Sequence, residues 1–281
     1  MLRTRLVASE FKDAVEKSKG VCAIPIGCTE NHGIHLPLGC DTIWGSTFTQ
    51  RAAELEPVCV FPEMYFGEKS GAGEYPGTII FPTTLIWQIL EASCNEIARN
   101  GFQKIVLMNS HGGNKDMLNA FARQILQKNP NYQVYVFQYD LPSMQVLLDN
   151  ADQYPYLTEE DIACIRSYVE EGKRDGHGGF VETSCCYDSC PEDCRLENRD
   201  KLDGESTHLF RGFREHSLYT PFEWMGNYPN SLGCSYHAGV NDRIAKAIGE
   251  MQTKKAAAAF KFLKEETVSF EYHAQWLKKQ K

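Results

Sequence analysis

The sequence predicts an α/β fold, a three-layer sandwich in which helices cover both faces of a mainly parallel sheet. Two observations predict it. Short runs of almost uninterrupted apolar residues, typical of strands covered on both faces, lie at 21–27, 58–61, 104–109 and 134–138. Amphipathic segments of helical length alternate with them at 42–56, 84–100 and 114–128. Such strand–helix alternation builds parallel sheets, because a helix makes each crossing between parallel strands.

The remaining elements follow from local signals. The segment at 84–100 ends at Gly101, and the one at 114–128 ends before Pro130, as helices commonly do. Further helices are expected at 159–171 and 242–265, whereas 197–230 is expected to be mostly irregular. The glycine-rich stretch 67–77 is expected to form a lid or a subunit contact. Polar clusters follow the predicted strand ends, where ligands of such sheets gather.

Length and composition predict the setting of this chain. Its 281 residues, 42% of them hydrophobic, suit one domain over residues 1–281. The eleven cysteines are an odd number and are scattered, which favours a reducing, cytoplasmic compartment. The charged start does not resemble a signal peptide, and no stretch reaches the roughly 18 apolar residues of a membrane span. The net charge of −8 disfavours nucleic acid, so a small-molecule substrate is expected.

Three clusters of histidines and carboxylates are the candidate chemistry of this chain. The first follows the apolar run at 21–27 and contains Glu30, His32 and Asp41. Residues two apart in an extended segment face the same side, so Glu30 and His32 can converge on one site. The turn past Pro37 then brings Asp41 back toward them. Imidazole and carboxylate ligands together suit zinc, manganese or iron.

The second and third clusters lie further along the chain. His111 stands at the end of the run at 104–109, and Gly112 and Gly113 after it let the backbone approach a ligand closely. The third cluster supplies His177 and Glu182 just before residues suited to starting a helix. A single buried histidine or glycine-rich turn is usually structural. Three such clusters beside the ends of predicted elements favour a metal site instead.

Charge counting indicates a pair of cations. Glu30, Asp41 and Glu182 bring three negative charges, and one bridging hydroxide makes four. Two divalent cations balance that charge in a site that would otherwise be costly to bury. We therefore expect two divalent metal ions per subunit, zinc first, with manganese or iron as the alternatives.

The same clusters resemble the motifs of the creatininase (creatinine amidohydrolase) family. The resemblance runs, in the family's order and approximate spacing, through residues 25–41, 75–78, 109–114 and 177–184. It implies a sandwich of mostly parallel strands, assembly as a hexamer and a dinuclear metal site. Carried over residue by residue, it implies that Asp41 bridges the ions. Glu30 and His111 would hold one ion, and His32 and Glu182 the other.

The chain departs from the creatininases proper at one position. Those enzymes carry a glutamate ligand two residues after the histidine that matches His111, and this chain has Gly113 there. The carboxylate is therefore assigned to Glu182, and creatinine itself is not the expected substrate. We expect a hydrolase that cuts the non-peptide C–N bond of another small amide, cyclic or similar, with water activated by the two ions.

His177 is the candidate catalytic residue. It is flanked by glycines and can lie close to a substrate, where it would donate a proton to the leaving nitrogen. The alternative role is to orient Glu182 without touching the substrate. His35 is expected outside the ligand set, because the turn at Pro37 takes it away from the first cluster.

Cysteines recur every four residues late in the chain. Cys186, Cys190 and Cys194 follow Cys185 at the spacing of one helix face, which would suit a zinc or iron–sulfur site. However, Pro191 interrupts that helix, and the sequence contains no CxxC pair. The expected role of these cysteines is therefore that of small buried hydrophobic residues.

Three other functions stay open. A cysteine-nucleophile enzyme would use Cys28 or Cys40 and would resist chelators. A deformylase, or a peptidase that trims a modified peptide, would use the same metal site. A non-catalytic binding protein is disfavoured, because every matched ligand position is filled. Substrate contacts are expected within 67–77 and 197–236, but Arg211, Arg214 and Trp224 are expected to be solvated surface.

Overall fold

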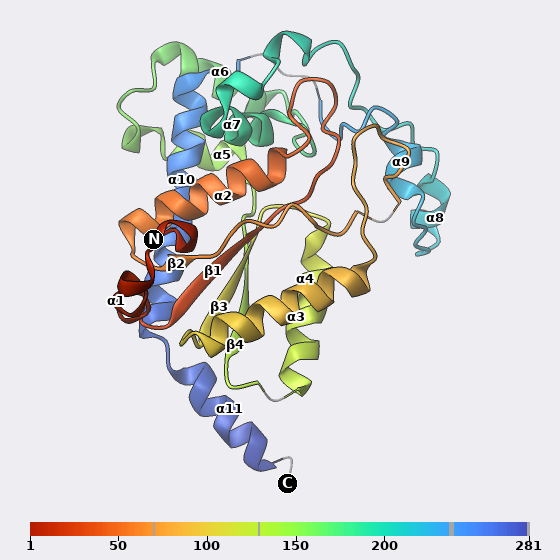
Figure 1. Ribbon diagram of the computed structural model, residues 1–281. Coiled ribbons are helices and arrows are strands. Elements are labelled where there is room, and N and C mark those ends of the chain that lie inside the picture. The colour runs from red at the N-terminus through yellow and green to blue at the C-terminus, as the bar shows by residue number, and fades with distance from the viewer. Residues whose placement is uncertain (70, 129, 236–238, 280–281) are drawn as a thin grey trace.

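The strands form one parallel sheet. A computed structural model describes residues 1–69, 71–128, 130–235 and 239–279 (Figure 1). The strands are β1 (Val21–Ile26), β2 (Cys59–Val60), β3 (Lys104–Asn109) and β4 (Gln133–Gln138). Their order is β2–β1–β3–β4, and every neighbouring pair is parallel. The predicted parallel sheet is therefore confirmed.

Helices connect and cover these strands. They are α1 (Phe11–Lys17), α2 (Cys40–Leu55), α3 (Thr83–Arg99), α4 (Asn114–Gln127), α5 (Met144–Asp149), α6 (Glu159–Glu170), α7 (Phe180–Ser189), α8 (Arg211–Glu215), α9 (Glu223–Asn227), α10 (Asp242–Glu265) and α11 (Val268–Lys279). The five helices that the sequence predicted correspond to α2, α3, α4, α6 and α10, with ends that differ by at most two residues. The helices α1, α5 and α11 were not expected, and neither were the short helices α8 and α9, which lie in a stretch expected to be mostly irregular.

Side chains of the central strands alternate between two apolar cores. Val21 and Ala23 of β1 join Phe48 of α2 and Ile248 of α10 in one core. The intervening residues of β1 and alternate residues of β3 pack with α3 and α4 in the other core, and the set is Cys22, Ile24, Ile26, Ile105, Leu107, Ile86, Leu90, Leu118 and Phe121. Figure 1 shows α2 and α10 on one side of the sheet and α3 and α4 on the other. This arrangement gives three layers, and period-two alternation explains why the strands read as continuous apolar runs.

The sheet order creates a crevice between β1 and β3. The chain leaves β1 through α2 on one face of the sheet and leaves β3 through α4 on the opposite face. Neighbouring parallel strands whose connections depart to opposite faces open a crevice at their carboxyl ends, where ligands bind in folds of this kind. The first two polar clusters follow these two strands, so both lie at this crevice.

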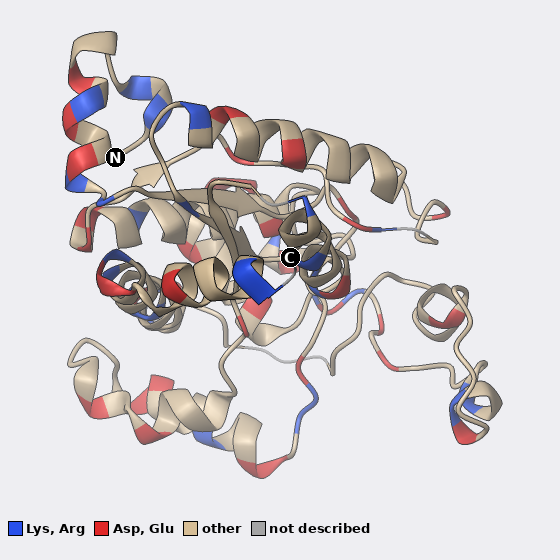
Figure 2. Cartoon of the chain, turned by 90° about the horizontal axis from the view of Figure 1, so that it is seen from below, with Lys and Arg blue, Asp and Glu red and all other residues tan. Residues whose placement is uncertain are grey.

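The outer surface carries the charge. Lysine, arginine, aspartate and glutamate lie mainly on helices and loops, and the sheet that they surround is mostly uncharged (Figure 2). The helix α11 projects from the body of the molecule, and none of its residues up to Lys279 is buried. Among the described residues, no helix combines the length and apolar character that a membrane crossing requires.

Candidate metal centre

The end of β1 and the start of α2 position the first cluster. After Ile26 the chain forms an irregular turn that carries Glu30 and His32, and Asp41 is the second residue of α2. All three side chains are buried, with at most 1% of each residue exposed. The hydroxyl of Thr42 donates a hydrogen bond to the carbonyl oxygen of Cys28 at 3.2 Å, which ties the helix start to the strand end. The first cluster is thus held by both elements.

Asp41 and Glu30 meet His111 at one position. The Nδ1 atom of His111 lies 2.8 Å from Glu30 Oε1 and 2.9 Å from Asp41 Oδ2. Its other ring nitrogen, Nε2, lies 2.9 Å from the carbonyl oxygen of Glu68. A carbonyl oxygen only accepts, so Nε2 carries the hydrogen and neutral His111 presents a free Nδ1 lone pair. These three side chains therefore offer one nitrogen and two carboxylate oxygens to a shared point.

The other oxygen of Asp41 faces a second histidine. His32 Nε2 lies 3.4 Å from Asp41 Oδ1 and 3.5 Å from Glu182 Oε2. The Nδ1 atom of His32 lies 3.2 Å from the carbonyl oxygen of Glu30 and donates to it, which leaves Nε2 as the free lone pair. The structure thus brings together all five residues that the sequence nominated as ligands, in two groups that share Asp41.

Glu182 comes from a third part of the chain. It lies in the first turn of α7, and its Oε2 atom accepts a hydrogen bond from the backbone N–H of Gly178 at 2.6 Å. Gly178 has φ +67°, a conformation that L side chains rarely adopt, and a Cβ there would lie 2.4 Å from Leu232 Cδ2. Only glycine fits at position 178, and its backbone N–H holds the Glu182 carboxylate in place.

Gly113 has a physical explanation in this fold. A Cβ at Gly113 would lie 2.5 Å from His111 Nε2 and 2.9 Å from the carbonyl oxygen of Glu68. The loop that orients His111 therefore occupies the space that a glutamate side chain would need. Glu182 places a carboxylate beside His32 instead, and its role as a ligand stays a prediction.

The donor atoms fit a metal ion. Among the described residues, Glu30 Oε1, His32 Nε2 and Asp41 Oδ1 are buried polar atoms without a hydrogen bond. A buried polar atom left unpaired costs about 1–3 kcal/mol, more if it is charged. The ligand atoms of Cys28, Glu30, Asp41 and His111 all lie within 4.8 Å of one another. Unpaired donors of nitrogen and oxygen type that face one another are what a divalent ion would satisfy.

The pKa values in this cluster follow from its packed charges. Burial opposes the imidazolium of His111, but Glu30 and Asp41 outweigh burial and raise the pKa of His111 to about 10. Burial also opposes charge on His32, yet Glu182 and Asp41 raise its pKa well above the usual value. Burial favours the neutral acid of Asp41, but the two histidines hold its pKa below the usual range. Without a metal ion, protons on the two histidines balance the carboxylates, and an ion would displace those protons.

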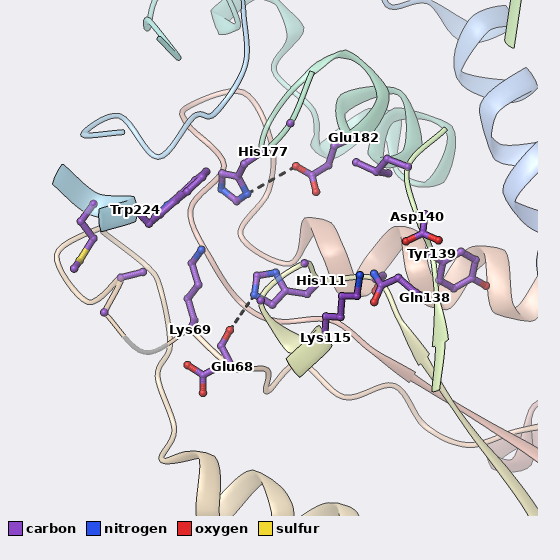
Figure 3. A pocket seen from close by; sticks show the side chains of 18 of the residues that line it. Glu68, Lys69, His111, Lys115, Gln138, Tyr139, Asp140, His177, Glu182 and Trp224 are labelled. Carbon is purple, nitrogen blue, oxygen red and sulfur yellow. Dashed lines mark hydrogen bonds and ion pairs between the residues drawn. The ribbon is translucent and has the colours of Figure 1, made fainter. Parts of the chain in front are cut away.

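His177 lies beside this cluster and faces the cavity (Figure 3). Its Nε2 atom donates to the carbonyl oxygen of Asn31 at 2.8 Å, so neutral His177 has its lone pair on Nδ1. That Nδ1 atom is 3.9 Å from both Glu30 Oε1 and Glu182 Oε2. The ring stacks on His32 with centroids 4.0 Å apart. Burial and the neighbouring charge of His32 lower the pKa of His177, which keeps it neutral near pH 7.

Comparison with known proteins identifies the family. The model of the creatininase family, described as creatinine amidohydrolase, matches residues 4–273. The chain belongs to the creatininase family. The resemblance stated from the motifs is therefore confirmed, and the description of the family is that of a hydrolase acting on a C–N bond outside peptides.

Two characterised proteins are similar in sequence to part of this creatininase-family chain. Creatinine amidohydrolase of Pseudomonas putida is 29% identical over 111 residues, which cover 38% of this chain and 43% of that protein. Mycofactocin precursor peptide peptidase of Mycolicibacterium smegmatis is 32% identical over 103 residues, which cover 34% of this chain and 41% of that protein. The matched stretches therefore span less than half of either relative.

Solved structures share the fold. A crystal structure of creatinine amidohydrolase (creatininase) superposes with a TM-score of 0.68 and 21% identity, over 95% of this chain and 98% of that one. A manganese form of creatininase gives a TM-score of 0.68 and 21% identity, over 92% and 96% of the two chains. Identity this low shows the fold alone, and it confirms the predicted arrangement of a parallel sheet flanked by helices.

A cavity of about 780 Å³ opens beside the cluster. The 67–77 loop, the ends of β3 and β4 and the segment 219–225 line it, through residues that include Lys69, Lys115, Gln138, Tyr219, Trp224 and Met225. The expectation of solvated surface was wrong for Trp224, whose ring lies edge-on to His177 with centroids 5.2 Å apart. It was right for Arg211 and Arg214, whose side chains are 74% and 78% exposed.

Sequence reasoning missed Lys69. Its ammonium forms an ion pair with Glu30 Oε2 and lies 5.3 Å from the centre of the Trp224 ring. Burial opposes this charge, but Glu30 outweighs burial and raises the pKa of Lys69. The composition of the 67–77 loop predicted a cover for the site, but nothing in an irregular segment indicates which side chain turns inward.

Three other expected residues take defined places. His35 Nε2 lies 3.0 Å from the hydroxyl of Thr183, so His35 stands outside the ligand groups, against the start of α7. The thiol of Cys28 donates to Asp41 Oδ2 at 3.2 Å. Burial, followed by the nearby carboxylates, raises the pKa of Cys28, and burial raises that of Cys40. Buried thiols that stay protonated are poor nucleophiles, so the structure disfavours a cysteine-nucleophile enzyme.

Proposed function

We propose that this chain is a metal-dependent amidohydrolase that cuts a C–N amide bond other than a peptide bond. One observation carries the proposal: the two oxygens of Asp41 face two different histidines, and a second carboxylate stands beside each histidine. Three of these five buried side chains are carboxylates, and burying them at one point is costly unless positive charge balances them, which two divalent ions would supply.

The proposed ligand sets follow the two groups. Glu30, His111 and Asp41 would hold one divalent ion, and His32, Glu182 and Asp41 would hold the other. Solved creatininases of this fold include a zinc–zinc form and a manganese form, which supports zinc or manganese here, with iron as a third option. When bound, two such ions supply a water of lowered pKa and stabilise negative charge on the substrate carbonyl oxygen.

The residues of the chain supply proton transfer and binding. His177 is neutral with a free lone pair on Nδ1, so it would accept a proton there from the attacking water and then donate it to the leaving nitrogen. Its hydrogen bond to the Asn31 carbonyl oxygen stabilises the imidazolium that forms in between. The Trp224 ring beside it offers a flat apolar surface to the substrate.

The substrate is proposed to be a small amide, cyclic or similar. Lysines and carboxylates both line the cavity, Lys69 and Lys115 together with Glu68, Asp140 and Glu182, so the charge of the lining favours neither an anion nor a cation. The runner-up is a formamide or a modified peptide, and two observations favour it. The cavity of about 780 Å³ is large for a small ring, and one of the matched relatives is a peptide peptidase.

Metal analysis with a hydrolysis screen tests the proposal. Protein purified without added metal would be analysed for its elements and then tested on cyclic amides, formamides and short peptides. We expect bound divalent metal and hydrolysis of one substrate class. Asp41→Ala should lose hydrolysis and the two ions of this centre, because that change removes their shared ligand. Hydrolysis that persists in Asp41→Ala, or in fully chelated wild-type protein, would refute the proposed mechanism.

The wider setting is also proposed. We infer that residues 1–281 form one domain that works in the cytoplasm on a small molecule rather than on nucleic acid or at a membrane. Assembly as a homohexamer is proposed from the family resemblance. Sedimentation of the purified protein tests it, and a monomer at micromolar concentration would contradict it.

A further inference from the structure

Three cysteine sulfurs converge behind the centre. Cys186 lies on α7, Cys190 caps the end of that helix, and Cys194 follows the short 3-10 turn Pro191–Asp193. The Sγ atom of Cys186 is 3.7 Å from that of Cys190 and 3.9 Å from that of Cys194. All three residues are buried, and their sulfurs lie within 4.8 Å of one another. The helix break at Pro191 is what turns the chain back and gathers them.

A fourth cysteine lies beside this group but outside it. Cys40, the first residue of α2, is fully buried and contacts Cys186, but its sulfur lies within 4.8 Å of ligand atoms of His32 and Asp41 rather than within that distance of all three other sulfurs. The thiols of Cys190 and Cys194 otherwise contact backbone carbonyl oxygens, at 3.5 Å and 3.6 Å. Thiols are weak donors, so these contacts stabilise the group little. Three cysteines from the end of α7 and the turn after it thus share one small buried space.

The spacing of the sulfurs suits one tetrahedral ion. Zinc–thiolate bonds of about 2.3 Å place neighbouring sulfurs of a tetrahedron about 3.8 Å apart. The two distances in this group, 3.7 Å and 3.9 Å, fall on either side of that value. A disulfide would need about 2.05 Å, and thiolates around an iron–sulfur cluster must stand further apart because they enclose several atoms.

We propose that Cys186, Cys190 and Cys194 bind a single thiophilic divalent ion of the zinc type, separate from the carboxylate–histidine centre, with the fourth position open to water or another small ligand. Binding would displace the thiol protons and join the end of α7 to the turn that follows it. The helix α7 carries Glu182, one helical turn before Cys186. The ion is therefore a structural brace that holds α7, and with it the Glu182 carboxylate, in place.

Cobalt spectroscopy tests this site. Full-length protein would be purified under reducing conditions, stripped of metal and loaded with Co²⁺, whose tetrahedral thiolate complexes absorb strongly in the near ultraviolet. We expect this absorption in the wild type, and we expect its loss, with one ion fewer per chain, in Cys190→Ser combined with Cys194→Ser. The matched control is Cys185→Ser, which changes a buried cysteine of the same helix outside the sulfur group and should keep the absorption.

Two further outcomes decide against the site. Absorption that survives the double substitution but disappears in Cys28→Ser would assign the thiolate to the carboxylate–histidine centre and overturn the proposal. A second measurement uses the wild-type protein alone. Zinc that is released when a mercurial reacts with its thiols can be quantified, so this test does not depend on whether a variant folds. A wild-type protein with no thiolate–cobalt absorption and no zinc released by the mercurial would equally overturn it.

Discussion

His177 is the residue on which turnover is expected to depend most. Replacing it with alanine removes the proton carrier but no proposed ligand, so His177→Ala should keep its metal and lose about 10²–10⁴-fold in kcat. Metal analysis and kinetics on the same preparation measure the metal content and kcat. The control is His216→Ala, which changes an exposed histidine directly after α8. Full activity in metal-replete His177→Ala would reject the role.

The acid limb of the pH profile reports on the same residue. Burial lowers the pKa of His177, so its neutral form persists below the usual histidine pKa of about 6.5. The wild-type kcat/KM should therefore stay high through pH 6.5 and fall only at lower pH, as the Nδ1 atom becomes protonated. A fall that begins above pH 7 would show that another group carries the proton.

Lys69 is expected to oppose metal binding. Its ammonium is paired with Glu30, so a divalent ion must approach against a positive charge. At an effective dielectric constant of about 20, two unit charges about 4 Å apart repel by about 4 kcal/mol, and a divalent ion doubles that figure. Lys69→Met should therefore bind the ion at least about tenfold more tightly in competition with a chelator, whereas Lys115→Met, in the same cavity, should change affinity less. Weaker binding in Lys69→Met would contradict this expectation.

Residue positions were predictable where a strand end fixed them. Glu30, His32 and His111 follow buried apolar runs directly, so the sequence could place them at one edge of a sheet. Lys69 and Trp224 lie in irregular segments, whose path depends on tertiary packing and leaves no periodic signal. Cys186 and its neighbours were correctly expected to be buried, but the convergence of their sulfurs follows from the turn after Pro191, whose direction the sequence does not reveal.

At the scale of elements, Asp161 joins two helices. It accepts a hydrogen bond from the backbone N–H of Thr158 at the start of α6, and others from Asn241 and Arg243 at the start of α10. Burial opposes its ionisation, but Arg243, Thr158 and Asn241 hold the pKa of Asp161 well below the usual range. The paired carboxylate therefore stabilises the fold above about pH 4, the unfolded pKa of aspartate, and the effect is lost as pH falls toward the folded value.

Asp161→Asn tests this link. The free energy of unfolding at pH 7 should fall by about 1–3 kcal/mol, because the amide keeps the shape but loses the charge. Urea unfolding at pH 7 and near pH 3 should show the difference between variant and wild type shrinking at the lower pH. Glu160→Gln, an exposed residue of the same helical turn, should change little. A difference that is the same at both pH values would assign the loss to something other than the charge.

The elements themselves were largely predictable. The helices α3, α4 and α10 show clear amphipathic patterns, and signals such as Gly101, Pro130 and the N-cap Asn241 mark their limits, so their predicted bounds came within two residues. The short α5 was missed because six residues give too little periodicity. The helix α11 was also not predicted, and in the structure none of its residues is buried.

For the whole molecule, metal removal is expected to lower thermal stability. The proposed ligands meet only in the folded chain, so an ion stabilises the native state by about 2.7 kcal/mol when its free concentration is about 100 times Kd. For a chain of this size, that corresponds to a shift in Tm of about 5–10 °C. Thermal unfolding with chelator and then with restored zinc measures the shift, and an unchanged Tm would argue against metal at this centre.

The spread of these ligands along the chain has a consequence for synthesis. A nascent chain that has completed β3 and α4 already contains Glu30, Asp41 and His111, but it still lacks Glu182 until α7 leaves the ribosome. On the proposed assignment, the two positions therefore mature in a fixed order. The ion between His32 and Glu182 is captured last. A chain that stops before residue 180 could hold at most the other ion, the one assigned to Glu30, Asp41 and His111.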